Sequence, residues 1–313
     1  MGQQQDLTFP SADGVHTVHA QVWLPDAPPV AVVQMVHGIS EHIGRYAGLA
    51  AFLNEHGVAA LGHDHLGHGR TARDSSEFGC FPARDGWKTV NRDVHTLREL
   101  GAERFPGLPY FLLGHSMGSF QARTYLIDYP GTVDGCVLMG TGQEPAPVVF
   151  FGKMLSNVLK AVKGPAYVSK FITFLSLGVY NQRFAPNRTK SDWISSSEAA
   201  VDAYLADPLC RFVPTVGMFS AMMEGIGYIG SAKNCARMDP RTPVLLLSGG
   251  DDPVGACGKG VAKVLRLFQN AGCRDVGMKL YPGDRHELFG ETDHQTVFGD
   301  LLEWMEARVA AEV

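Results

Sequence analysis

Short apolar runs alternate with longer amphipathic stretches along most of this 313-residue chain. The run at residues 16–24 alternates polar and apolar positions, which is typical of an antiparallel strand with one wetted face. Because helical stretches separate most of the later runs, the pattern predicts an α/β fold whose mostly parallel sheet is covered by helices on both faces. These later runs are mostly apolar, as buried parallel strands are, and lie at residues 30–36, 58–61, 110–113, 135–139, 243–247 and 276–281.

Roughly 100 residues separate the predicted strands at 135–139 and 243–247, far more than one crossover helix needs. We therefore predict a core of residues 1–141 and 241–313 and an inserted helical cap at residues 142–240. Most apolar residues of the cap are expected to pack it onto the core, and the rest to line a tunnel. One predicted helix places six of them on one face, namely Val148, Phe151, Leu155, Val158, Leu159 and Val162. Two further apolar groups follow along the chain. The first is Phe171, Phe174, Leu175 and Leu177, and the second is Met218, Phe219, Met222 and Met223.

The stretch Gly114–Gly118 places Ser116 on a sharp turn between an apolar strand and a predicted helix at residues 117–128. Small residues two positions before and after the serine let the backbone turn tightly. Such a turn presents the hydroxyl above the carboxyl edge of a sheet. Ser116 is therefore the candidate nucleophile.

In one class of serine hydrolases an acid and then a histidine follow the nucleophile along the chain, each on a loop after a later strand. His286 follows the predicted strand at 276–281, whereas His294 begins a terminal helix, so His286 is the better candidate base. The strand at 243–247 leads to both Asp251 and Asp252, and we favour Asp252 as the acid. Asp284 is too close to His286 in sequence to come from a separate loop.

Acyl transfer also requires donors for the oxyanion, usually two backbone N–H groups. The residue after the nucleophile, Met117, supplies one. The strand at 30–36 leads into His37 and Gly38, and a bend at Gly38 would turn the N–H of Ile39 inward.

Five segments together resemble the monoacylglycerol lipases and lysophospholipase-like hydrolases, a group also described as serine aminopeptidase-like. The resemblance covers residues 8–313. It implies the α/β-hydrolase fold, Ser116, Asp252 and His286 as the triad, and the Ile39 and Met117 amides as the oxyanion hole. It also implies that Glu41 and Arg45 line the polar end of the pocket, where a glycerol headgroup would sit. The matching segments are 37–46 (HGISEHIGRY), 62–71, 114–118 (GHSMG), 250–254 and 283–287.

The chain departs from this family pattern at Ser119, which replaces a second glycine, at Thr71, which replaces a serine, and in the poorly matching middle of the chain. Because of these departures, the resemblance does not define the substrate. We expect a serine carboxylic-ester hydrolase acting on monoacylglycerols or other single-chain lipid esters. An aminopeptidase or amidase is the alternative, since Glu198, Asp202 and Asp207 could hold an ammonium group. A binding protein without turnover is a further alternative.

The composition of the chain limits the kinds of partner and the cellular location that can be expected. A net charge of −5 and a pI near 6.2 argue against nucleic acid binding. No apolar run is long enough for a membrane span and the start lacks a signal-peptide profile, so a cytoplasmic protein is expected. The sequence leaves the oligomeric state open. Six scattered cysteines without a C-x-x-C pair argue against a structural zinc site.

We expect no cofactor and no metal. His63, His65 and His68 approach the spacing of binuclear metal sites, but Gly67 stands where an aspartate is required, so a hydrogen-bonded loop is favoured. The front of the cap, residues 145–191, carries basic residues and no acid. This half of the cap could contact an anionic membrane, or its charges could be balanced by acids of the core. The basic residues are Lys153, Lys160, Lys163, Lys170, Arg183, Arg188 and Lys190.

Overall fold

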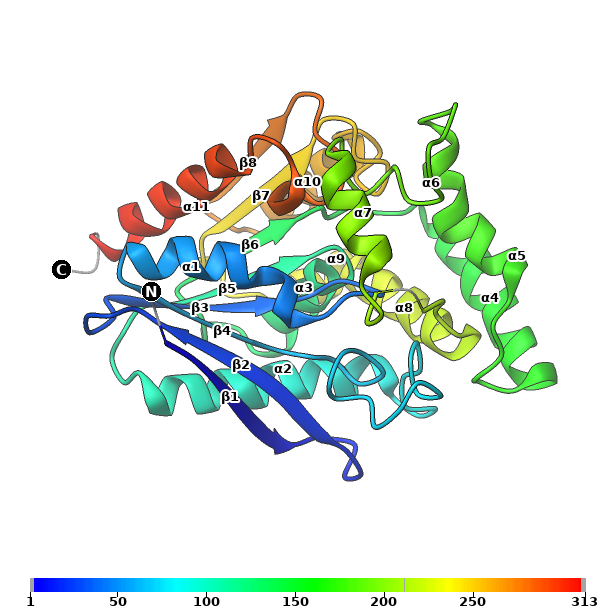
Figure 1. The fold of residues 1–313 in the computed structure, drawn as a ribbon, viewed down its shortest axis with the longest axis horizontal. Helices are drawn as coiled ribbons and strands as arrows, with labels where there is room; N and C mark the ends of the chain where they lie inside the picture. The colour runs from blue at the N-terminus through cyan, green and yellow to red at the C-terminus, as the bar shows by residue number, and fades with distance from the viewer. Residues whose placement is uncertain (1–2, 211, 311–313) are drawn as a thin grey trace.

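The computed structural model describes residues 3–210 and 212–310. Its centre is an eight-stranded sheet in the order β1-β2-β4-β3-β5-β6-β7-β8 (Figure 1). β2 is antiparallel to β1 and β4, and the remaining neighbours are parallel, which confirms the predicted α/β fold. The strands are β1 Gln3–Pro10, β2 Thr17–Leu24, β3 Ala31–Val36, β4 Val58–His63, β5 Tyr110–His115, β6 Gly135–Met139, β7 Val244–Gly249 and β8 Val276–Tyr281.

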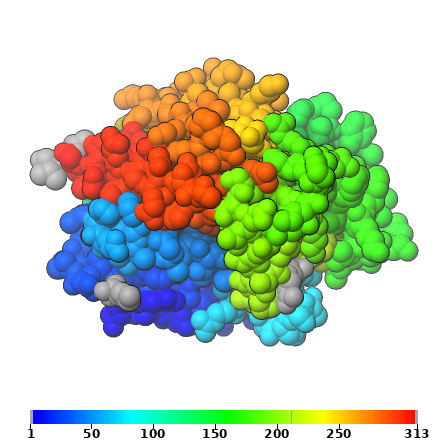
Figure 2. Space-filling model, turned by 45° about the horizontal axis from the view of Figure 1, so that its top comes forward, coloured from blue at the N-terminus to red at the C-terminus, as the bar shows by residue number. Residues whose placement is uncertain are grey.

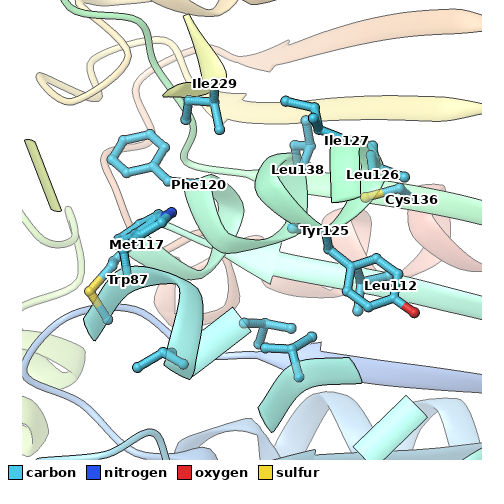
Figure 3. Close-up of a cluster of buried hydrophobic side chains, with 14 of the residues drawn as sticks. Trp87, Leu112, Met117, Phe120, Tyr125, Leu126, Ile127, Cys136, Leu138 and Ile229 are labelled. Carbon is cyan, nitrogen blue, oxygen red and sulfur yellow. The ribbon is translucent and has the colours of Figure 1, made fainter. Parts of the chain in front are cut away.

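Side chains of the inner strands are buried alternately on the two faces of the sheet, because successive residues of a strand point to opposite sides. On one face they pack against α1 (Ala47–Glu55) and α11 (His294–Val309). On the other they pack against α2 (Gly86–Arg104), α3 (Met117–Asp128) and α10 (Lys259–Asn270). Figure 3 shows part of this second cluster, with Leu112 of β5 and Leu138 of β6 beside the side chains of α3.

The segment between β6 and β7 forms a helical layer beyond one end of the sheet (Figures 1 and 2). We call residues 142–240 the insertion. Within it, α8 packs against α2 and α3 of the core, and α4 packs against α8 on the outer side. Its elements are α4 Ala146–Lys163, α5 Lys170–Thr173, a π-helical turn Phe174–Gly178, α6 Val179–Gln182, α7 Glu198–Ala206, α8 Val216–Ile229 and α9 Ala232–Cys235.

The apolar residues of the insertion divide into buried and exposed groups. Met218, Phe219 and Met222 of α8 are buried, as expected for residues that pack the insertion onto the core. The predicted apolar face of α4 is instead largely open, with Phe151 59% and Val162 71% exposed. The expectation that most of these residues pack onto the core is therefore wrong for α4, because α8 lies between α4 and the sheet. Among the described residues, no helix combines the length and apolar character that a membrane crossing requires.

Candidate active site

Ser116 lies at the tip of a sharp turn between β5 and α3. Its backbone has φ 53° and ψ −121°, a rarely populated combination that costs about 1–3 kcal/mol. The two glycines of the motif have no room for a side chain. A Cβ on Gly114 would lie 2.3 Å from the Gly118 carbonyl oxygen, and a Cβ on Gly118 would lie 1.9 Å from that of Val36. The close approach of α3 to β5 and β3 therefore explains both glycine positions.

The loop after β3 passes directly beside this turn. A Cβ built on Gly38 would lie 3.0 Å from the Cβ of Ser116. The next residue, Ile39, donates its N–H to no backbone carbonyl of the described residues. Met117 is the first residue of α3, where N–H groups have no acceptor within the helix. Both amides are thus available as donors near Ser116, and their role in an oxyanion hole stays a prediction.

His286 and Asp252 meet at the carboxyl edge of the sheet. The distance from His286 Nδ1 to Asp252 Oδ1 is 3.0 Å, and both side chains are buried. His286 Nε2 is buried without a hydrogen-bond partner among the described residues. The imidazole also lies against Gly140, whose neighbour Met139 accepts the Ser116 N–H at 3.0 Å. A carboxylate bound at Nδ1 favours the tautomer whose free Nε2 can accept a proton, so this pair has the arrangement of a base and its orienting acid.

The other candidate residues have different partners. Asp251 forms an ion pair with Arg183 at 3.1 Å, and His294 Nδ1 lies 2.7 Å from a backbone carbonyl oxygen. Burial and nearby carboxylates raise the pKa of Asp284 to about 7. Among the described residues, Asp252 is therefore the one of these three acids that hydrogen-bonds to the predicted base.

Glu41 is 1% exposed and is not among the residues that line the cavity beside Ser116. Its carboxylate accepts hydrogen bonds from the Gly38 N–H, from Arg45 Nη1 at 3.0 Å and from the Tyr46 hydroxyl at 3.1 Å, and it lies 3.0 Å from His115 Nδ1. Although burial alone would raise the pKa of Glu41, His115 and Arg45 lower it to about 2. The Glu41 carboxylate is thus ionised, and its oxygens are already paired with protein groups.

Arg45 also lies outside the cavity wall. Its guanidinium makes two hydrogen bonds of 2.7 Å to the carboxylate of Glu287, the residue after the predicted base. The predicted headgroup contacts of Glu41 and Arg45 stay untested. The structure instead places both residues in a buried network that holds the loop after β3 and the histidine loop together.

His115 extends this network to the residue directly before Ser116. Its Nδ1 faces Glu41, and its Nε2 faces the His286 carbonyl oxygen at 3.3 Å. Because both acceptors lack a proton to donate, both ring nitrogens of His115 must carry protons to satisfy them. Burial alone would lower the pKa of His115, but Glu41 raises it. His115 cannot be assigned this role from the sequence, since no local pattern identifies its partners.

The remaining histidines near the site support the loop after β3. His65 donates its N–H to His37 Nε2 at 3.0 Å, and its own Nε2 lies 3.1 Å from the His37 carbonyl oxygen. Burial lowers the pKa of His63 and of His68 to about 4, so both rings are neutral. His68 Nδ1 lies 3.0 Å from the Leu66 carbonyl oxygen, whereas both ring nitrogens of His63 have no hydrogen-bond partner among the described residues.

One group within the described parts of the chain has three potential metal ligands close together, namely His42, Asp207 and Cys210. In the structure, His42 Nε2 lies 2.8 Å from Asp207 Oδ2, and this pair links the loop after β3 to the insertion. The other acids proposed for an ammonium group, Glu198 and Asp202, lie near Arg188. These three acids are absent from the cavity wall.

Ser116 opens into a cavity of about 630 Å³ between the core and the insertion. Ile39 and Met117 line it together with apolar residues of α4, α8 and the π-helical turn. Trp193 also lines it, and its ring lies 5.0 Å from that of His286. No sequence motif marks Trp193, because its position depends on how the insertion folds back over the sheet. The apolar lining includes Phe120, Leu155, Leu177, Phe219, Met222 and Ile226.

The sheet order, the strained serine turn and the histidine–aspartate pair at one sheet edge together define an α/β hydrolase. Comparison with known proteins agrees. Residues 27–293 match the family model described as serine aminopeptidase, S33, and the chain therefore belongs to this family. The resemblance predicted from the sequence is thus confirmed.

Two relatives match over nearly their whole length. The monoacylglycerol lipase of Mycolicibacterium smegmatis is 30% identical, over 96% of this chain and 97% of its own. The human monoglyceride lipase is also 30% identical, over 98% of this chain and 92% of its own. Among solved structures, a thermostable carboxyl esterase from Bacillus coagulans in complex with glycerol has a TM-score of 0.91 and 30% identity, covering 98% of this chain and 99% of its own.

Proposed function

We propose that this chain, a carboxylic-ester hydrolase, acts on monoacylglycerols or similar single-chain lipid esters. The observation that carries the proposal is the cavity, which brings an extended apolar wall to Ser116. Burying each methylene of a chain contributes about 0.8 kcal/mol, so such a wall favours an acyl chain over a polar substrate. The names of the two relatives, and the glycerol in the Bacillus coagulans esterase structure, support the same substrate class.

In the proposed mechanism His286 Nε2 takes the proton of the Ser116 hydroxyl as the oxygen attacks the ester carbonyl. Asp252 holds the imidazole through Nδ1 and stabilises its charged form. The N–H groups of Ile39 and Met117 donate to the negative oxygen of the tetrahedral intermediate. His286 then protonates the leaving alcohol, and a water activated by the same ring releases the fatty acid from Ser116.

In this proposal the insertion acts as a cap, which supplies the acyl-binding wall. Val148, Phe151 and Leu175 line the cavity and are each at least 50% exposed, so in this proposal the substrate enters on the outer apolar side of α4 and the π-helical turn. An apolar chain can therefore enter without crossing a polar rim.

A substrate panel tests this function. For p-nitrophenyl esters of increasing chain length, kcat/KM is expected to rise with each methylene until the cavity is filled, because each added methylene is transferred from water to an apolar wall. Monoacylglycerols should be hydrolysed and an aminoacyl anilide should not. A preference for the anilide would contradict the proposal and favour the aminopeptidase alternative.

We further propose that the outer face of the insertion contacts anionic lipid bilayers. Three basic residues of the insertion, Lys153, Arg183 and Arg188, lie near carboxylates. These pairs agree in part with the alternative that acids balance the basic charge. Lys163 and Lys170 are exposed and form no ion pair among the described residues. The same segment, from α4 to the π-helical turn, also carries large apolar side chains that are each at least 48% exposed: Phe150, Phe151, Met154, Val158, Val162, Phe171, Phe174 and Leu175.

The double variant Lys163→Glu, Lys170→Glu should bind vesicles containing phosphatidylserine about ten-fold or more weakly than the unchanged chain. Each basic residue near such a surface contributes about 1 kcal/mol, and reversal adds repulsion. Co-sedimentation at low salt measures the effect. The variant Lys233→Glu, Lys259→Glu carries the same charge change on α9 and α10 and should bind normally. The proposed membrane contact would be excluded if both variants bound the vesicles equally well, or if binding did not depend on the content of anionic lipid.

A further inference from the structure

Glu144 is the one charged side chain among the described residues that line the cavity. It lies between β6 and α4, is half-buried, and its carboxylate accepts no hydrogen bond from the described residues. Burial raises the pKa of this carboxyl, and the charge of Lys263 on α10 opposes the rise. A carboxylate in an apolar wall without a donor costs free energy, which a bound hydrogen-bond donor can recover.

Ring contacts connect Tyr180, which lines the same cavity as Glu144, to the predicted base. The His286 ring lies 5.0 Å from Trp193, and Trp193 lies 5.3 Å from Tyr180, which also lines the cavity. Burial raises the pKa of Tyr180, and the charges of Glu144 and Asp252 raise it further. In the proposed mechanism His286 protonates the leaving alcohol. Tyr180 and Glu144 line the cavity into which Ser116 opens, and in this proposal they face the departing alcohol.

We propose that Glu144 and Tyr180 hold hydroxyl groups of the alcohol half of the substrate, and that Glu144 makes the enzyme prefer polyol esters to simple alkyl esters. A carboxylate accepts from a hydroxyl, and a phenol can donate or accept. This inference rests on the proposed ester hydrolysis. It differs from the headgroup role predicted for Glu41 and Arg45, whose polar atoms are already engaged with protein groups.

Two esters with the same acyl chain test the proposal. 1-Octanoylglycerol and propyl octanoate both have a three-carbon alcohol, and the glycerol ester alone has two free hydroxyls. The measured quantity is the ratio of their kcat/KM values at concentrations below micelle formation. Effects on folding or on the chemical step act on both esters and cancel in this ratio, so it reports recognition of the hydroxyls.

We expect the unchanged chain to favour the glycerol ester and Glu144→Leu to lower the ratio about ten-fold or more, because a hydrogen bond to a charged group is lost. Glu144→Gln keeps an uncharged acceptor and should give a smaller loss, as should Tyr180→Phe. The control Glu224→Leu removes a carboxylate from α8 outside the cavity wall and should leave the ratio unchanged.

An unchanged ratio in Glu144→Leu would overturn this subsite, and so would an unchanged chain that hydrolyses both esters equally well. Neither result would affect the proposed ester hydrolysis. Failure of the unchanged chain to hydrolyse either ester, or any p-nitrophenyl ester, would instead overturn the proposed function, so the two failures are distinguishable.

Discussion

Replacement of Ser116 by alanine is expected to lower kcat for ester hydrolysis by about 10⁴- to 10⁶-fold. The hydroxyl is the group that forms the acyl-enzyme, and no other serine occupies the turn between β5 and α3. Alanine keeps the Cβ, so the strained backbone and the contact with Gly38 are retained. Turnover of a p-nitrophenyl ester, together with covalent labelling by a fluorophosphonate, measures the loss.

Ser119→Gly is the matched control. Ser119 lies one turn along α3 and donates its hydroxyl to the Ser116 carbonyl oxygen at 2.6 Å, so the variant removes a nearby hydroxyl that has no place in the reaction. It should still label stoichiometrically. If Ser116→Ala kept more than about 1% of the turnover, or still labelled, the nucleophile would have to be another residue.

The sequence predicts the inner part of the fold well, because each inner strand is buried on both faces and so reads as a short apolar run. Six strands, β3 to β8, follow from such runs within a few residues, and β2 follows from its alternation of polar and apolar positions. β1, at Gln3–Pro10, was not predicted. It is mostly exposed and pairs with β2 alone, so nothing forces apolar residues into it. Its polar glutamines give no signal of the long antiparallel register that the backbone forms.

The candidate site is predictable to the extent that local motifs define it. The glycines around Ser116 report close backbone packing, and the histidine and acid loops follow strands that the pattern identifies. Glu41 shows the limit of such reasoning. Its position in a motif marks it as important, but its burial depends on Tyr46, Arg45 and His115, and these partners are brought together only by folding.

The same limit explains Glu144 and Trp193. Both belong to the insertion, where α8 rather than α4 covers the core. Apolar periodicity identifies a helix face but does not say whether another helix, a ligand or a membrane covers it. The outer face of α4 is apolar and exposed, so periodicity alone assigns it wrongly to the core.

Asp252→Asn is expected to lower kcat by about 10⁴-fold with little change in the fold, since the asparagine fits the same space. An amide can donate to His286 Nδ1, which would place the ring proton on Nε2 and leave that nitrogen unable to accept a proton from Ser116. The carboxylate also accepts the Val254 N–H at 2.9 Å, so the side chain is fixed in this orientation. Steady-state kinetics with a p-nitrophenyl ester, alongside a melting curve, measures the two effects separately.

Asp251→Asn makes the same chemical change one residue away. Asp251 is partly exposed and pairs with Arg183 of the insertion, and such surface ion pairs contribute about 0–1 kcal/mol. Its kcat should therefore stay within about two-fold of the unchanged chain. The reverse order, with Asp251→Asn inactive and Asp252→Asn active, would assign the orienting acid to the exposed residue. That result would require the loop after β7 to rotate in solution, because successive side chains on this loop face opposite environments.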